Sequence, residues 1–357
     1  MLRRRLAVRQ LLDHTGCDGI VITDASVIRY LTGLMGAGVC ALLHARGGEL
    51  FADYTRYRAM RRATGWNVHC TGGQPWISAI TWVLEEDIRR VGYDSWKTPA
   101  GLIEYSKKRC VGRVEWFDVG GPISELRRIK DRKEIDSLRQ AAMATEMVLD
   151  SSIPLLRDGI TENEWAVHIH AKLMETTGEL PAFFTMVAFG ENTVHPHWEN
   201  SNRRLSPGDT VIVDCGATVN GYCADITRTF FWKRASARQL RRLKIIVDVL
   251  EAAIAHIRTG TVCSEIDAIV RSELALVVLD RYYLHPLGHG VGLDLHENPV
   301  FSVDSEDQIM VDMAFALEPG VFIPGWGGIR IEEMIWYSSQ GPIVLSQGRN
   351  KNWSVVQ

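Results

Sequence analysis

An Asn-Gly pair at 220–221 joins two apolar segments rich in β-branched residues, and this pattern is the strongest short-range signal for a β-hairpin. A two-residue turn at this pair places Asp214 opposite Thr227 on the facing strands. Asp225 then lies diagonal to Asp214 on the same face, where Cβ atoms are ~7–8 Å apart or closer. Two carboxylates at this spacing suit a pair of metal ions, which lie ~3.5–4 Å apart in binuclear sites.

A second interpretation of Asp214 and Asp225 is that they are solvent-facing acids on an edge strand. The segments that flank them are strongly apolar, so we expect the hairpin to be buried. An unpaired charge in a buried hairpin is costly, and a bound cation relieves that cost. The apolar flanks therefore favour a metal site. The alternation of side chains along a strand directs Cys215 to the opposite face, so its thiol is not an expected ligand.

Three histidines, His285, His289 and His296, lie within twelve residues and are interspersed with three glycines. A single histidine is more often structural than functional. Imidazole, however, is the commonest neutral metal ligand, and glycine allows the backbone to approach a site closely. The combination indicates that this segment contributes to a site.

Two glutamates follow strand-like apolar runs further along the chain: Glu318 precedes Pro-Gly, and Glu332 follows Arg330 by two residues. Because Arg330 and Glu332 share parity, they point to the same face of a strand. Two aspartates, two glutamates and one histidine form a set of oxygen donors with one nitrogen. Such a set suits Mn²⁺, Co²⁺ or Zn²⁺ in a binuclear hydrolytic centre better than a thiolate site does.

The first third of the chain mixes strand-like and helical patterns, which indicates a small α/β domain. The Gly-Gly-Pro cluster at 120–122 then interrupts the chain, so we expect two domains, at 1–121 and 122–357. Within the first domain the expected elements are strands at 19–23, 40–43 and 48–53 and a helix at 79–91.

The second domain contains a weak internal repeat. Residues 157–164 match residues 258–265 at an offset of 101, with three identities in eight positions. Each copy follows a long helical pattern, at 131–155 and at 237–257, and is followed later by an acid-x-Gly turn. The match either arises by chance or reflects two structurally similar halves, with the candidate site residues at their junction.

The overall charge is balanced: 40 Lys and Arg against 43 Asp and Glu give a net charge of −3. This balance predicts no nucleic-acid or anionic-membrane partner. The longest uncharged run, 30–45, is shorter than the ~20 residues that cross a bilayer. Seven scattered cysteines without a Cys-x-x-Cys pair indicate reduced thiols, and no apolar core follows the basic start, so we expect a cytoplasmic protein.

These motifs, in this order, resemble the Xaa-Pro peptidases, meaning prolidase and aminopeptidase P, which have the pita-bread metallopeptidase fold. Residues 18–23 and 30–33 are similar to the creatinase-type N-terminal domain, and 126–135 resembles the usual entry to the catalytic domain. The resemblance implies an α/β (α+β) protein, with a creatinase-like domain at 1–121 and a pita-bread domain with a pseudo-twofold repeat at 122–357. Carried over to this sequence, the metal ligands are Asp214, Asp225, His289, Glu318 and Glu332.

The same resemblance implies a hydrolase with two divalent ions per chain. Mn²⁺ or Co²⁺ is the expected metal, ahead of Zn²⁺. Asp225 and Glu332 would bridge the ions, and a metal-bridging hydroxide would attack the Xaa-Pro imide bond of a dipeptide or of a peptide N-terminus. The implied partners are a small proline-containing peptide and a second copy of the chain in a homodimer.

The accessory catalytic residues of the family also have matches here. Glu318 would shuttle a proton, and His197 and His296 would donate hydrogen bonds to the oxyanion or to the leaving nitrogen. Arg330 would hold either a ligand carboxylate or His285, which flanks the ligand histidine.

Three positions depart from the pattern or leave its substrate open. Val300 stands where many prolidases have an arginine that reads a dipeptide's carboxylate, which favours either an aminopeptidase P-like range or another amide over strict dipeptide specificity. Trp198 and Trp326 would either narrow a pocket or pack in the core. The alternatives are hydrolysis of a non-peptide C–N bond, as in ectoine hydrolases, and an inactive binding module. The complete ligand set disfavours the inactive module.

Overall fold

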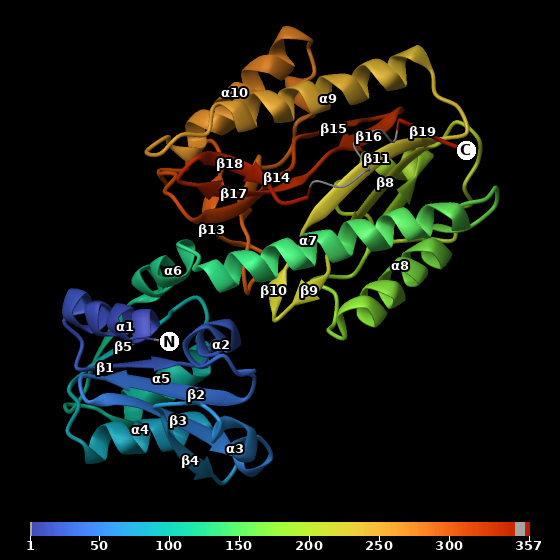
Figure 1. Ribbon diagram of the computed structural model, residues 1–357. Coiled ribbons are helices and arrows are strands. Elements are labelled where there is room, and N and C mark those ends of the chain that lie inside the picture. Colours follow the sequence, from blue (N-terminus) through green and yellow to red (C-terminus); the bar gives the residue numbers. More distant parts are fainter. Residues whose placement is uncertain (1, 347–353) are drawn as a thin grey trace. The chain divides into compact units, whose positions relative to one another are not determined.

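The computed structural model describes residues 2–346 and 354–357, and contacts divide the chain into two units, Met1–Arg127 and Arg128–Gln357 (Figure 1). The domain boundary expected at 121–122 lies within helix α6 (Gly120–Arg128), which contains the point of division. No helix in the part of the chain that the structure describes is both long and apolar enough to cross a membrane.

The N-terminal unit is a six-stranded mixed sheet in the order β4-β3-β2-β1-β5-β6, with helices packed around it. The three predicted strands are confirmed. The helix predicted at 79–91 is wrong at its end, because α4 stops at Glu85 and Asp87 takes a positive φ of 51° before the next strand begins. The elements are α1 (Leu2–Thr15), β1 (Gly19–Ile22), α2 (Ala25–Thr32), β2 (Val39–His44), β3 (Gly47–Asp53), α3 (Tyr54–Met60), β4 (Asn67–Thr71), α4 (Pro75–Glu85), β5 (Arg90–Tyr93), α5 (Ala100–Arg109) and β6 (Glu115–Asp118).

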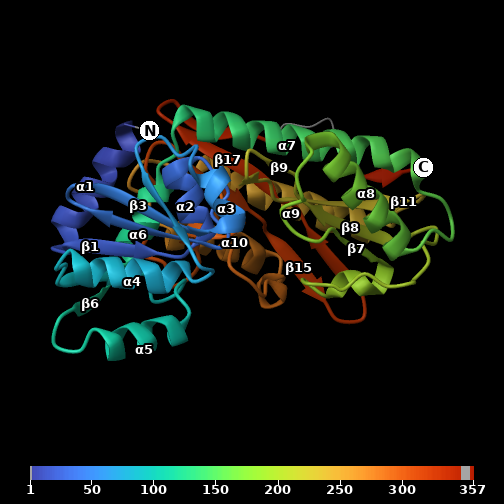
Figure 2. The same ribbon diagram turned by 90° about the horizontal axis from the view of Figure 1, so that it is seen from below.

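In the described residues the C-terminal unit has two larger sheets, each covered by a pair of helices, and two sheets of two strands each. One larger sheet has the order β19-β11-β8-β7, in which β19 is parallel to β11 and the other pairs are antiparallel. The other is antiparallel throughout and has the order β13-β12-β14-β17-β18. Helices α7 and α8 run side by side in both views, and α9 and α10 lie on the other side of the strands (Figures 1 and 2). The helices are α7 (Arg132–Ser152), α8 (Glu162–Thr177), α9 (Ala237–Ala255) and α10 (Cys263–Leu276), with short 3-10 helices η1 (Ile153–Leu155), η2 (Gly190–Val194) and η3 (Asp280–Tyr282).

The strands of this unit place the candidate site residues at or beside their ends. They are β7 (Met186–Phe189), β8 (Thr210–Cys215), β9 (Thr218–Val219), β10 (Tyr222–Cys223), β11 (Ile226–Trp232), β12 (Gly288–Gly290), β13 (Glu297–Phe301), β14 (Met313–Leu317), β15 (Gly320–Ile323), β16 (Gly327–Arg330), β17 (Glu333–Ser338), β18 (Gly341–Val344) and β19 (Val355–Val356). Each helix pair buries its apolar face against its own sheet, which gives two hydrophobic cores.

The internal repeat is present in the structure. Gly159 N donates to Leu205 O at 2.9 Å in the first half, and Gly260 N donates to Ile309 O at 2.8 Å in the second. Single β-bridges pair Thr161 with Arg204 and Val262 with Gln308, at corresponding positions. The offset is again 101 at the helix starts, so the sequence match reflects two halves that repeat the same turn. This confirms the pseudo-twofold repeat.

The Asn-Gly hairpin has the predicted register. Asp214 pairs with Thr227 between β8 and β11, and the bond from Ala224 N to Ala217 O keeps the same register towards the turn. Gly216 lies close to the backbone of the facing hairpin strand. A Cβ at this position would be 1.8 Å from Ala224 O, so only glycine fits. The hairpin therefore brings both aspartates to one end of the sheet.

Candidate metal centre

The five residues predicted as metal ligands come from both halves of the C-terminal unit and meet at one place. Asp214 lies near the end of β8 and Asp225 directly before β11, whereas His289 lies in β12. Glu318 follows β14, and Glu332 precedes β17. The four carboxylates and the imidazole thus lie where strands from both sheets begin or end.

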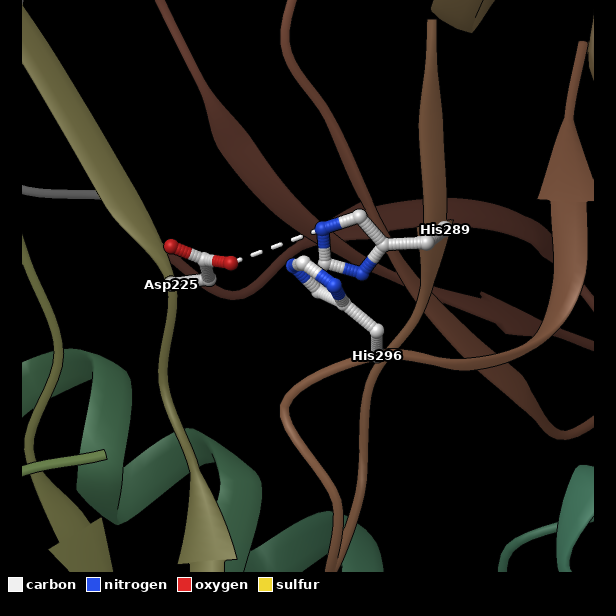
Figure 3. Close-up of side chains that lie close together, drawn as sticks. All are labelled: Asp225, His289 and His296. Atoms are coloured by element: carbon white, nitrogen blue, oxygen red, sulfur yellow. Dashed lines mark ion pairs between the residues drawn. The ribbon is translucent and has the colours of Figure 1, made fainter. Parts of the chain in front are cut away.

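Their donor atoms form three overlapping groups, each within 4.8 Å. Figure 3 shows the imidazole of His289 directed at Asp225, with His296 beside it; His289 Nε2 is 3.5 Å from Asp225 Oδ2. The sequence predicted His296 as a hydrogen-bond donor, and the structure also places it within ligand distance. The groups are Asp214, Asp225 and Glu332; His289, Glu318 and Glu332; and Asp225, His289 and His296.

The carboxylates repel one another in a desolvated site. Burial first, and then the negative charges of neighbouring carboxylates, raise the pKa of Asp225 and of Glu332 well above their ordinary values. Burial also raises the pKa of Asp214, against the opposing effect of Arg330, and raises that of Glu318 to about 7. The site therefore has an excess of negative charge that bound cations would neutralise.

Two oxygens in this cluster test whether a metal fits. Asp214 Oδ1 and Glu332 Oε1 are buried and have no hydrogen-bond partner. A buried polar atom without a partner is unfavourable, so such atoms usually have a ligand to satisfy them. Hard oxygen donors with one or two imidazoles are the ligands that Mn²⁺, Co²⁺ and Zn²⁺ accept. The residues present fit a divalent-ion centre.

Arg330 is 2% exposed and connects the cluster to the loop that carries His197. Its Nη2 donates to Asp214 Oδ2 at 2.6 Å, and its Nη1 donates to the carbonyl oxygen of Pro196 at 2.8 Å. Of the two predicted roles, the structure supports the contact with a ligand carboxylate. Its contact with Pro196 was not predicted.

Sequence reasoning missed Thr227, which has no exposed surface. Its hydroxyl donates to Glu332 Oε2 at 2.8 Å and accepts from Arg330 Nε at 3.1 Å. The hairpin register already placed Thr227 opposite Asp214 on the site face. That position was the signal that could have identified it.

Burial lowers the pKa of three histidines around the cluster, His285, His289 and His296, and so favours their neutral form. Burial, and for His289 the charge of His296, lowers the pKa of His285 and of His289 to about 4. His289 Nδ1 lies 3.1 Å from the carbonyl oxygen of Gly290, which assigns the proton to Nδ1 and leaves Nε2 as the donor to a metal. His285 Nε2 is buried without a partner. His197 is exposed.

Both tryptophans that were left open pack against protein. Trp198 packs against a small cluster that includes Met186 and Phe322. Trp326 packs against the second core, and the Arg242 guanidinium lies 4.0 Å from its ring centroid. Val300, in β13, is 37% exposed, so its side chain is open to solvent, and this side chain carries no charge.

Two family matches together cover most of the chain. Residues 136–338 match metallopeptidase family M24, and residues 4–129 match the Creatinase/Prolidase N-terminal domain. The first match spans more than half of the chain, and the site geometry agrees with it. The chain belongs to metallopeptidase family M24.

Three of its similar proteins span nearly its whole length. The structure of the Xaa-Pro dipeptidase from Bacillus anthracis has a TM-score of 0.93 and 26% identity, covering 99% of both chains. That of the X-Pro aminopeptidase from Thermotoga maritima has a TM-score of 0.88 and 25% identity, covering 97% of this chain and 100% of the other. The Xaa-Pro dipeptidase of Pyrococcus horikoshii is 29% identical over 334 residues, which are 93% of each chain.

Proposed function

We propose that this protein is a binuclear metallopeptidase that hydrolyses the imide bond between an N-terminal residue and proline. The observation that carries the proposal is the sharing of residues between ligand groups. Glu332 belongs to the group with Asp214 and Asp225 and also to the group with His289 and Glu318. A shared carboxylate between two adjacent donor sets supports two ions bridged by Glu332, with Asp225 as the second bridge.

The proposed ligands are Asp214, Asp225, His289, Glu318 and Glu332. Two divalent ions bound there would supply Lewis acidity and would lower the pKa of a water near the scissile bond. The chain's own contribution is a buried site whose ligand atoms lie close together before any ion binds. Arg330 keeps Asp214 oriented through its 2.6 Å contact.

The remaining roles belong to groups in and around the cluster. In the metal-free protein burial raises the pKa of Glu318 to about 7; bound cations would lower it, so that Glu318 would accept a proton as an ionised carboxylate beside the ions. His197 and His296 lie beside the cluster and would donate hydrogen bonds to the peptide oxygen or the leaving nitrogen. His285, kept neutral by burial, would line the substrate side next to Phe322, whose ring lies 5.6 Å away.

The proline specificity rests on the similar proteins, whose names give an Xaa-Pro dipeptidase and an X-Pro aminopeptidase. Val300 offers no cation for a dipeptide carboxylate, so we propose that peptides longer than two residues are accepted.

The test uses chelator-dialysed protein reloaded with Mn²⁺, Co²⁺ or Zn²⁺, with Gly-Pro and a Gly-Pro-Xaa peptide assayed in parallel. Two ions per chain with cleavage support the proposal. No cleavage of any Xaa-Pro peptide by protein that holds two ions refutes it and moves the substrate to another C–N bond. Asp225→Asn is expected to abolish cleavage, with Asp158→Asn, which changes an exposed acid bonded to Lys233, as the matched control.

The finer properties are proposed on separate grounds. The oxygen-rich donor set supports Mn or Co as the native metal. The seven cysteines, all within the described residues, are free thiols, which supports a reducing, cytoplasmic location. The homodimer stays a prediction, which the molar mass measured by light scattering will test.

A further inference from the structure

Glu162 is a carboxylate buried at the start of α8, and the proposed chemistry does not use it. It has no exposed surface, and Thr161, which precedes it, caps the helix. A charged side chain in this position requires partners, because an isolated buried carboxylate is strongly unfavourable.

Five donors from one segment converge on this carboxylate. Oε1 accepts the backbone N–H of Phe189 at 2.7 Å and the side-chain amide of Asn192 at 2.9 Å. Oε2 accepts the indole N–H of Trp198 at 2.9 Å, together with the backbone N–H and the hydroxyl of Ser201 at 3.0 and 2.6 Å. Glu162 therefore connects both ends of the segment 189–201 to the start of one rigid helix.

The same segment carries His197 towards the carboxylate cluster. On the cluster side, Arg330 Nη1 donates to the carbonyl oxygen of Pro196. On the far side, the Trp198 indole is held by Glu162, and His195 stacks on that indole with ring centroids 5.1 Å apart. His197 is thus flanked on both sides by residues that are held in place.

The second half of the repeat shows that the first position of this helix does not need an acid. Cys263 occupies the position of Glu162 at the offset of 101, and it is fully buried in the second core. The equivalent backbone bonds form in both halves: Glu162 N donates to Arg203 O at 3.2 Å, and Cys263 N donates to Asp307 O at 2.8 Å. The carboxylate therefore serves the segment 189–201 rather than the helix.

We propose that Glu162 is a positioning residue that holds His197 over the carboxylate cluster by fixing Trp198, a role that rests on the function proposed above. The carboxylate of Glu162 fixes the indole of Trp198, and the indole in turn fixes the backbone at 197–198. Arg330 fixes Pro196, the residue before His197. The imidazole of His197 then faces the cluster without having to be ordered during each turnover.

The test removes one donor and keeps an aromatic ring at the same position. Trp198→Phe deletes the indole N–H that reaches Glu162. Trp232→Phe is the matched control, because it removes an equivalent indole bond that does not involve Glu162. Trp232 Nε1 donates to Asp158 Oδ1, and the two atoms are 2.7 Å apart. Glu162→Gln, which replaces one acceptor oxygen with a donor, is a second variant with the same expected local effect.

The first readout is amide hydrogen exchange in the metal-free protein, followed by mass spectrometry of peptides that cover 189–201. We expect exchange there to be roughly tenfold faster in Trp198→Phe, with a melting temperature, and a metal content after reloading, close to those of Trp232→Phe. Unchanged exchange in this segment, or the same change in Trp232→Phe, overturns the proposal.

The second readout is the division between kcat and KM in the metal-loaded enzyme. We expect Trp198→Phe to lower kcat about tenfold and to change KM less than about twofold, because His197 is misplaced while other substrate contacts remain. An unchanged kcat overturns the catalytic part of the proposal. If the wild type cleaves no Xaa-Pro peptide, the proposed function fails, whereas the exchange result still decides whether Glu162 positions this segment.

Discussion

Replacing Thr227 with valine removes one hydroxyl from beneath the carboxylate cluster and leaves the side-chain volume almost unchanged. Two bonds are lost, the 2.8 Å bond to Glu332 Oε2 and the 3.1 Å bond from Arg330 Nε. Glu332 Oε1 already has no partner, so both oxygens of that carboxylate would then lack a donor. Each buried group left unsatisfied costs about 1–3 kcal/mol, which predicts a loss of roughly 2–6 kcal/mol from the free energy of unfolding of the metal-free protein.

The more specific effect of Thr227→Val is on metal binding. Removing a partner that orients a ligand typically lowers metal affinity about 10- to 100-fold, and we expect this range for Mn²⁺ binding measured by calorimetry. Thr145→Val is the matched control. Thr145 is also fully buried and its hydroxyl also has two bonds, but its partners are the backbone groups of Ala141 and Ala217. Equal Mn²⁺ affinities in the two variants would refute the role of Thr227.

Three further predictions concern the same site. The raised pKa values of the carboxylates mean that the folded metal-free protein binds more protons than the unfolded chain. The stability that Glu318 contributes is present below its unfolded pKa of 4.5 and is lost as the pH rises through about 7, so over this range Glu318→Gln should make the melting temperature fall less with rising pH than in the wild type; identical profiles in the two proteins contradict this. Gly216→Ala should prevent the hairpin from closing, since its Cβ would lie 1.8 Å from a carbonyl oxygen, and circular dichroism melting should show a loss above about 3 kcal/mol. Gly101→Ala, with no atom within 4 Å of its Cβ, should instead stabilise by about 0.5–1 kcal/mol. Asp225→Asn should lower the metal content by at least one ion per chain in elemental analysis, and full retention of metal would argue against a bridging role.

The hairpin shows how much of the site the sequence could predict. The Asn-Gly turn sets its register, so the relation of Asp214, Asp225 and Thr227 followed from local rules. The helix at 79–91 was predicted too long because its apolar pattern continues into a strand, and the positive φ at Asp87 left no periodic signal.

The contacts that sequence reasoning missed are made by side chains far apart in the chain. Arg330 reaches the carbonyl oxygen of Pro196 across 134 positions, and Glu162 collects donors from residues 27 to 39 positions away. No periodicity records such partners, since they depend on how the two sheets pack. For the same reason the sequence left Trp198 open between pocket and packing, whereas its packing against Met186 and Phe322 and its bond to Glu162 resolve it.

We propose that the metal centre is binuclear and that Asp225 and Glu332 bridge its two ions. Anomalous diffraction from Mn²⁺-loaded crystals, recorded at the manganese absorption edge, tests it most directly. We expect two peaks ~3.5–4 Å apart, with carboxylate oxygens of Asp225 and Glu332 in contact with both. A single peak, or two peaks that share neither carboxylate, would contradict it.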